Sequence, residues 1–529
     1  MEFPDEKKIN EEVTKRFAVS GFFPHSSRTI SINQPLAEVA DLIFGDHSKP
    51  RHEIDVPENS AFTFSILMHE FFHLLCSQAT TVGIALAVSM EEYIISSFNI
   101  AKNYQGKLSN PIQRDNLIKI IEDEGGVEVL LKDNEQYSNN NLLSSLRYFL
   151  INDQIIEEAI SPCIQHSNFP SVLDIKKCSL VKKNGKYWIS ANDKHYYPFN
   201  YLLVIEGIAS IAEQITIQNC SSKLNQTILK EFNMLPLTEI IKFKSNKNNI
   251  YGLFNRYLQF NLPDRFQTGS AMLLICELIL QLGATLIKQK DDSLAVRIDE
   301  AGEITEKIFA ILHRPDCPDV VPHDLESFYK FYNYIIESVS GVPPQQYYND
   351  WGNCIIARME DSIILGKDRW ENCYGLFTAL TDKLFFAPRL PFDLFFFTKL
   401  FKIVKPSVFA PDVIYLSRFC VSYTYGIVDE EFLFNIIRNL VEGIPPVCHF
   451  NCVGICRGPL YGENCDDSLT SNNWKPCGFF DHQAEIKNIF GIKTPYSQPK
   501  DNFTKLIDFY KKNKKTVILE IIKDKGEHY

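Results

Sequence analysis

Five consecutive residues, His69-Glu70-Phe71-Phe72-His73, have the side chains and the spacing of a catalytic metal site. On a helix, positions i and i+4 lie on one face, so His69 and His73 can present two imidazole nitrogens to one metal ion. Glu70 follows the first histidine and can act as the general base toward a metal-bound water. A chain of this composition would contain roughly 0.02 copies of the pattern by chance. The motif therefore predicts a zinc site with His69 and His73 as ligands and Glu70 as the catalytic base.

The residues on both sides of this motif are apolar, at 64–68 before it and at 74–76 after it. A helix that is apolar nearly all round is a buried helix. Burying two histidines and a glutamate costs several kcal/mol unless something satisfies their polar atoms. A metal ion would satisfy them, and the alternative is a buried polar cluster that is hydrogen-bonded to its neighbours.

A catalytic zinc ion needs a third protein ligand, and two carboxylates compete for this role. Glu92 lies 19 residues after His73. Glu206 opens the octet 206–213 (EGIASIAE), in which Glu206 and Glu213 share one helix face and Gly207 allows a close approach to another segment. Apolar residues before and within the octet indicate a buried helix, although an amphipathic surface helix is the alternative. We favour Glu206 as the ligand, with Glu213 orienting a ligand imidazole.

The motif HExxH, followed at a distance by Glu-Gly-x-Ala-x-x-x-Glu, resembles many uncharacterised bacterial zincin-like proteins. The run of aliphatic, Gln, Thr and Gly residues over 73–83 is also similar to theirs. The resemblance covers about residues 60–215 and implies a zincin-like helical core and a zinc-dependent peptidase of the gluzincin type. It carries over His69 and His73 as ligands, Glu70 as general base and Glu206 as third ligand. The spacing of Glu92 resembles that of gluzincins, but residues 90–95 lack their surrounding motif, while the gap of 133 residues before Glu206 is longer than theirs.

Peptidases of this type use a Tyr or a His to stabilise the oxyanion. His195, Tyr196 and Tyr197 lie just before the predicted helix of Glu206 and are candidates for this role. The alternative is that these residues form an aromatic strand or loop that packs on the core.

The composition narrows the function classes. The chain has 529 residues and a net charge of −11, with 45% apolar and 22% charged residues, as in soluble globular proteins. An acidic chain lacks the basic surface of a general nucleic-acid binder. The first eight residues do not resemble a secretory signal, and no run of about 18 apolar residues is free of charge and proline. We therefore expect a cytoplasmic protein with no nucleic-acid or membrane partner, and a composition rich in Lys, Asn and Ile favours a bacterial source.

The apolar periodicity predicts a mainly α (α+β) fold with a few short strands. A hairpin is expected at 182–189, because Asn184-Gly185 favours a type I′ turn, and Asn200 is expected to cap the helix that carries Glu206. Helices are predicted at 61–101 (with a break near 80–83), 201–218, 269–290, 298–312, 324–339 and 429–442.

Three regions are expected along the chain. Residues 1–240 form the zincin-like metallopeptidase domain, 241–440 a helical recognition or regulatory region, and 441–529 a cysteine-rich segment and tail. Nine of the 14 cysteines are scattered through apolar segments and are expected to be small buried apolar residues. The other five lie beside His449 and His482 without a CxxC pair and could hold a structural metal, hold an iron–sulfur cluster or stay unligated; they are Cys448, Cys452, Cys456, Cys465 and Cys477.

The leading hypothesis is a zinc metallopeptidase that hydrolyses a peptide bond in a specific intracellular protein, with the zinc-bound water activated by Glu70. A large non-catalytic part favours restricted over digestive proteolysis. A binding or scaffold protein with a structural or degenerate HExxH site is the alternative, and a metal-dependent hydrolase of a non-peptide bond is a third reading. The sequence leaves the oligomeric state, the exact substrate and the activation trigger open.

Overall fold

The structure of the chain is a computed structural model. It describes residues 21–22, 29–32, 58–103, 141–160, 174–220, 250–288, 294–321, 324–362, 370–371, 373–375, 377–378, 413–416, 421–424 and 517–520.

The chain forms two compact units. One unit, here called the site unit, comprises Glu38–Ala87 and Ile155–Phe409 and holds both histidines of the HExxH motif. The second unit comprises Met1–Ala37, Val88–Gln154 and Ala410–Tyr529. The domain boundaries predicted near residues 240 and 440 lie outside the described residues, as do the cysteine cluster at 448–477 and the predicted helix at 429–442.

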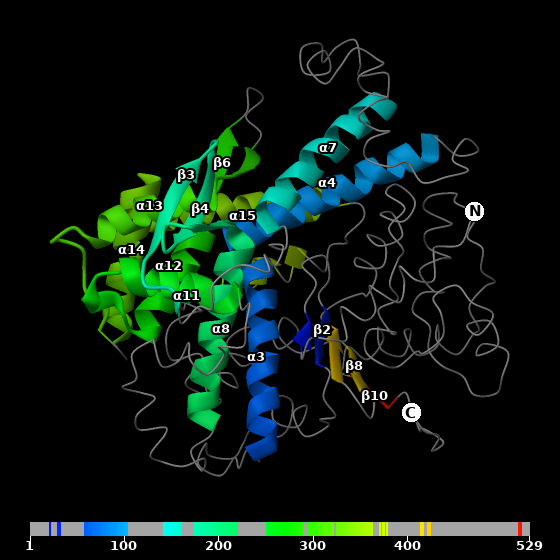
Figure 1. Ribbon diagram of the computed structural model, residues 1–529. Helices are drawn as coiled ribbons and strands as arrows, with labels where there is room; N and C mark the ends of the chain where they lie inside the picture. The colour runs from blue at the N-terminus through cyan, green and yellow to red at the C-terminus, as the bar shows by residue number, and fades with distance from the viewer. Residues whose placement is uncertain are drawn as a thin grey trace. The chain divides into compact units, whose positions relative to one another are not determined.

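The described part of the site unit is mainly helical, as the periodicity predicted. Helix α8 packs along α3 and also contacts α11 and α12, and Figure 1 shows α3 and α8 side by side. Helix α12 contacts both α13 and α14, these two helices contact each other, and α14 also contacts α15. The helices are α3 (Glu58–Ala79), α8 (Tyr201–Cys220), α11 (Ile250–Asn261), α12 (Gly269–Leu282), α13 (Ala301–Leu312), α14 (Leu325–Ser340) and α15 (Pro344–Asp361), with a short 3-10 helix η3 (Asp264–Phe266).

Two small antiparallel sheets accompany these helices. The first contains β3 (Cys178–Lys183), β4 (Lys186–Ala191) and β5 (His195–Pro198), and the second is the hairpin of β6 (Ala284–Lys288) and β7 (Leu294–Ile298). The turn between β3 and β4 confirms the predicted hairpin, because Asn184 and Gly185 both have positive φ, at 52° and 79°. Strand β5 leads directly into α8. The Leu203 backbone N–H donates to Asn200 Oδ1 at 3.2 Å, which confirms the predicted cap.

The second unit contains a five-stranded sheet. Its strand order is β1-β2-β9-β8-β10, in which β8 and β10 are parallel and every other neighbouring pair is antiparallel. Most of α4 and α7 belongs to this unit, where the rings of Tyr93 and Phe149 pack with centroids 4.6 Å apart. The elements are β1 (Gly21–Phe22), β2 (Thr29–Ile32), α4 (Thr81–Asn103), α7 (Asn141–Ile160), β8 (Val413–Leu416), β9 (Val421–Thr424) and β10 (Val517–Glu520).

The break predicted near residues 80–83 is confirmed. Helix α3 ends at Ala79, α4 begins at Thr81, and Thr80 Oγ1 donates to the Cys76 carbonyl at 2.6 Å. Within the described residues, no single helix is long and apolar enough to cross a membrane. The segments Met68–Ala79 and Thr81–Tyr93 reach that length only together, and they are bent by 75° at the break.

The predicted helix at 269–290 is wrong beyond Leu282, and the helix predicted from 298 starts three residues later, at Ala301. Residues 284–288 form β6, and residue 298 belongs to its partner β7. The mostly apolar sequence from α12 into β6 is compatible with either structure, and pairing with a later segment decides between them. Gly283 at the end of α12 was the local stop signal.

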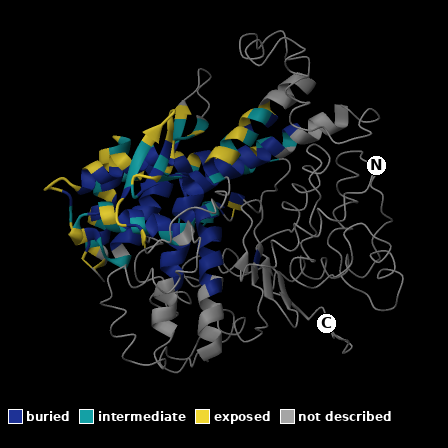
Figure 2. Cartoon of the chain, viewed as in Figure 1, coloured by how far each residue is buried: buried dark blue, intermediate teal, exposed yellow. Residues whose placement is uncertain are grey.

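The core of the site unit is formed by side chains between the packed helices α3, α8 and α12. Figure 2 shows the described residues of α3, α8 and α12 coloured mostly as buried. The burial of six of the nine scattered cysteines is described, and all six are buried free thiols, as predicted. Their apolar role agrees with the packing of a helical core; they are Cys76, Cys178, Cys276, Cys317, Cys354 and Cys373.

Candidate metal centre

Helix α3 positions both histidines of the motif. Its residues around 66–79 are almost all buried, because the helix is apolar on every side and packs against α8. The exposed fractions of His69, Glu70 and His73 are 7%, 5% and 4%. The imidazole rings of His69 and His73 lie with centroids 4.8 Å apart, as expected for positions i and i+4. The two side chains therefore occupy the same face of a buried helix.

Helix α8 brings two carboxylates to that face. Glu206 and Glu213 are two helical turns apart on α8, and both approach His69. The helix is buried rather than amphipathic at the surface, since the residues between them are buried. Gly207, beside Glu206, allows the close approach that the sequence predicted, because a Cβ atom there would collide with the ring of Phe254 on α11.

The Glu206 carboxylate lies between the two imidazoles. Its Oε2 atom is 3.4 Å from Nε2 of His69 and 3.5 Å from Nε2 of His73. These distances exceed the 2.7–2.9 Å typical of a charge-assisted hydrogen bond, and Oε2 has no hydrogen-bond partner among the described residues. Two ligand atoms of a tetrahedral zinc ion are about 3.3 Å apart, because each lies about 2.0–2.1 Å from the metal. The two distances to Glu206 Oε2 are close to the separation of two ligand atoms on one metal ion.

One atom each of His69, His73 and Glu206 lies within 4.8 Å of the others, so this buried group could hold a metal ion. No second group of three or more His, Cys, Asp or Glu residues with this geometry occurs in the described part of the chain. Glu92, the competing candidate, lies on α4 and is not a member of the group. The structure thus brings together the two histidines and the carboxylate that the sequence analysis favoured.

Glu213 contacts the opposite nitrogen of His69. Its Oε2 accepts a hydrogen bond from Nδ1 at 3.1 Å, and both residues are buried. When Nε2 gives up its proton to bind a metal ion, a proton fixed on Nδ1 leaves the Nε2 lone pair directed toward the Glu206 side. The predicted contact of Glu213 with an imidazole of the HExxH motif is therefore confirmed for His69, and the role of His69 as a metal ligand stays a prediction.

The group concentrates negative charge in a buried place. Burial alone would lower the pKa of His69, but the close Glu206 carboxylate, the hydrogen bond to Glu213 and the charge of Glu70 raise the pKa to about 10. Burial raises the pKa of Glu70, and the two imidazoles oppose this effect. Burial also acts to raise the pKa of Glu206, but the charge of His73 and contacts with both imidazoles hold it well below its usual range. Three carboxylates around two histidines provide the electrostatic environment that attracts a cation.

The three oxyanion candidates lie on β5. The Tyr196 hydroxyl donates to the Asp193 carbonyl at 3.4 Å, and the Lys183 ammonium lies 3.0 Å from the centre of the Tyr196 ring. In the described part of the chain, these contacts do not connect Tyr196 with the metal-binding group. Tyr197 is buried, in agreement with the alternative of an aromatic strand packed on the core. An oxyanion role for His195, Tyr196 or Tyr197 stays a prediction.

One buried carboxylate, Glu277, was not among the residues predicted from the sequence. Glu277 on α12 is 0% exposed and its Oε1 accepts a hydrogen bond from the Tyr332 hydroxyl at 2.8 Å, while Oε2 has no partner among the described residues. Burial raises its pKa well above the usual range. The sequence does contain a signal for a buried carboxylate here, because Glu277 is the only charged residue of the apolar helix α12.

Comparison with known proteins adds no relative: no protein-family model, curated protein or solved structure matches the chain. The interpretation of the centre therefore depends on its own geometry and chemistry.

Proposed function

We propose that this chain is a zinc-dependent hydrolase that cleaves a peptide bond in a specific protein. The observation that carries the proposal is the position of Glu206 Oε2, at 3.4 and 3.5 Å from the imidazole nitrogens of the HExxH motif. Two imidazoles and one carboxylate form the donor set of many catalytic zinc sites, which keep a fourth position for water or substrate. Mixed nitrogen and oxygen donors also favour zinc over magnesium or calcium.

In this proposal each side chain has a distinct task. His69, His73 and Glu206 hold the ion, and Glu213 fixes the ring of His69 through Nδ1. A bound zinc ion supplies Lewis acidity and lowers the pKa of a coordinated water. Glu70 accepts a proton from the attacking water and returns it to the leaving amine. Its place beside His69 on the buried face of α3 suits this task, since the charges of both imidazoles act on its carboxylate.

The acidic composition and the closed surroundings of the centre support a restricted substrate. His69, Glu70 and His73 are each less than a tenth exposed, so a substrate must displace or enter past neighbouring segments. We propose a cytoplasmic protein as the substrate class, rather than nucleic acid or lipid. The helical part beyond α8 would recognise it.

A change of Glu70 to Gln tests the proposed reaction. The variant should keep one equivalent of zinc and lose hydrolysis by at least about 100-fold, because the base is removed while the ligands stay. Zinc content by mass spectrometry and cleavage of casein and of a peptide library measure the two properties. A chelator should abolish wild-type cleavage, and Glu206→Ala should lose zinc whereas Glu92→Ala keeps it. Loss of zinc from Glu92→Ala alone would show that the third ligand was misassigned.

A structural metal site in a binding protein is the second candidate. The burial of the centre favours it, because structural zinc sites are closed whereas catalytic ones keep an open position. Wild-type protein that holds stoichiometric zinc but cleaves nothing in a proteome-wide screen would select this candidate. Protein purified without zinc, and unable to take it up, would exclude both.

A further inference from the structure

The last turn of α12 accepts hydrogen bonds from other helices. The final carbonyl groups of a helix have no partner within it and need donors from elsewhere. Here Thr81 Oγ1 lies 3.1 Å from the Leu280 carbonyl oxygen and 2.7 Å from that of Gln281, and it donates to this pair. The Tyr201 hydroxyl donates to the carbonyl of Gly283, at 2.9 Å. Side-chain hydroxyls therefore supply donors to this helix end, together with the Tyr347 hydroxyl, which donates to the Gln281 carbonyl, and the Asp299 backbone N–H, which donates to the Gly283 carbonyl at 2.9 Å.

The last turn of α12 is bonded to α3 and α8, which carry the three side chains of the group, and to α4, which follows α3. Tyr201 is the first residue of α8 and precedes Glu206 by five positions. The Gln281 side-chain amide donates in turn to the carbonyl of Ala79, the last residue of α3, at 2.8 Å. Ala79 follows His73 by six positions. One helix end thus binds the end of α3, the start of α4 and the start of α8.

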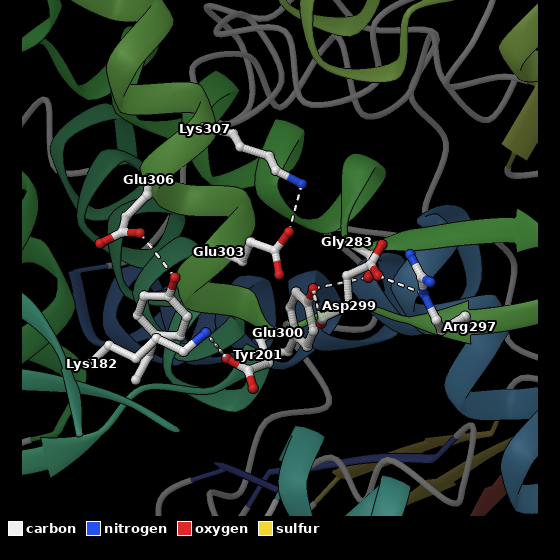
Figure 3. Close-up of polar contacts among 10 residues, drawn as sticks. Lys182, Tyr201, Gly283, Arg297, Asp299, Glu300, Glu303, Glu306 and Lys307 are labelled. Atoms are coloured by element: carbon white, nitrogen blue, oxygen red, sulfur yellow. Dashed lines mark hydrogen bonds and ion pairs between the residues drawn. The ribbon is translucent and has the colours of Figure 1, made fainter. Parts of the chain in front are cut away.

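Side chains from α8 and α4 pack directly against the backbone of Gly283. A Cβ atom on Gly283 would collide with the Tyr201 hydroxyl and would lie 2.6 Å from a methyl carbon of Val82 on α4. Figure 3 shows Tyr201 pointing toward Gly283, and Tyr201 also lies 2.7 Å from the Asp299 carbonyl. The residue must be glycine for both neighbours to approach the helix end. The contact therefore fixes α4 and α8 against the same few atoms.

We propose that the C-terminal turn of α12 (residues 280–283) is a positioning element of the metal centre, with Tyr201 and Thr81 as its positioning residues. The histidines and Glu206 lie on different helices, and their ligand atoms must stay within a few tenths of an ångström of their places to share one ion. Bonds from one rigid helix end to α3, α4 and α8 hold that separation. The inference deepens the proposed function and rests on its metal site.

Cobalt binding to the full-length protein tests this role, because the visible spectrum of Co²⁺ reports ligand geometry. Tyr201→Phe should weaken Co²⁺ binding by about 10-fold, the lower end of the effect of outer-shell changes at metal sites, and should shift the absorption bands. The matched control is Tyr332→Phe, which removes an equally buried phenol hydroxyl whose hydrogen bond goes to Glu277. The control should keep the wild-type affinity and spectrum.

A second pair of variants guards against misfolding. Thr81→Val removes the hydroxyl and should act like Tyr201→Phe, whereas Thr81→Ser keeps the hydroxyl and should restore wild-type binding. Unchanged Co²⁺ affinity and spectrum in both Tyr201→Phe and Thr81→Val would overturn the positioning role while the metal site stands. Equal weakening by Tyr332→Phe would assign the effect to general stability and would also overturn it. Wild-type protein that binds neither Co²⁺ nor Zn²⁺ would overturn this role together with the proposed function.

Discussion

His69 is the residue on which most of the site's interactions converge. Glu206 approaches its Nε2 atom and Glu213 binds its Nδ1 atom, so carboxylates of one helix hold the ring from both sides. Such outer carboxylates orient a ligand imidazole and increase its basicity. In the proposed centre, the ring of His69 would therefore be held by Glu213, which is not one of the three proposed ligands.

Replacing Glu213 by Gln tests this dependence. The variant keeps the volume and removes the charge, so the charge-assisted hydrogen bond to Nδ1 is lost. We expect zinc affinity to fall by about 10- to 100-fold, measured by competition with a chelating dye. Glu303→Gln is the control, because Glu303 pairs with Lys307 on α13 with both side chains about half exposed. An affinity equal to that of the wild type would remove Glu213 from the metal site.

The sequence predicted the members of the metal group because their spacing is local. Positions i and i+4 place His69 and His73 on one face of any helix, and the octet 206–213 keeps Glu206 and Glu213 on another. The choice between Glu206 and Glu92 is not local, since it depends on which helix packs against α3. The bonds of Thr81 and Tyr201 had no sequence signal, because their acceptors are backbone carbonyls that every residue carries.

At the level of helices and strands, the sequence predicted the features that depend on residues close together in the chain. The break at Thr80, the Asn184-Gly185 turn and the Asn200 cap follow from residues within a few positions of each feature. The β6–β7 hairpin depends on pairing between residues six to fourteen positions apart, and apolar periodicity does not reveal such pairing. Helix α15 begins at Pro344, a start signal that the periodicity analysis did not use.

The ionisation of Glu277 on α12 should make the free energy of unfolding depend on pH. Burial raises the pKa of Glu277 well above that of an unfolded glutamate, about 4.3. The neighbouring Cys76, Tyr332 and Tyr348 have pKa values raised by burial and stay neutral at the same pH. Between the two pKa values of Glu277 the folded state holds a proton that the unfolded state has released, so the free energy of unfolding falls as pH rises. The slope reaches about 1.4 kcal/mol per pH unit.

Glu277→Gln removes this titration and keeps the shape of the side chain. Urea unfolding from pH 5 to pH 8 should therefore show the wild type losing stability relative to the variant as pH increases. At pH below about 4.3 the contribution of Glu277 should be constant, because both states are protonated there. Parallel stability curves for the two proteins would mean that Glu277 is ionised in the folded state.

For the whole molecule, a metal ion bound at the proposed centre would close a long loop of chain. A ligand that binds only the folded state stabilises it by RT ln(1 + [L]/Kd), about 4 kcal/mol at 1,000 times Kd. His73 and Glu206 are 133 residues apart, and unfolding separates them, so the unfolded chain should bind zinc much more weakly. Removing zinc with a chelator should lower the Tm of the wild type by several degrees, and added zinc should restore it.

The double variant His69→Ala, His73→Ala separates binding at this centre from other effects of the chelator. It should unfold at a Tm that neither chelator nor zinc changes, because it lacks both imidazole ligands. If the double variant responded as the wild type does, the stabilising zinc would lie elsewhere in the chain, with the five clustered cysteines at 448–477 as the next ligands to replace. If the wild type showed no response, zinc would not couple to folding, and the three side chains gathered from α3 and α8 would have to be held together by hydrogen bonds and helix packing alone.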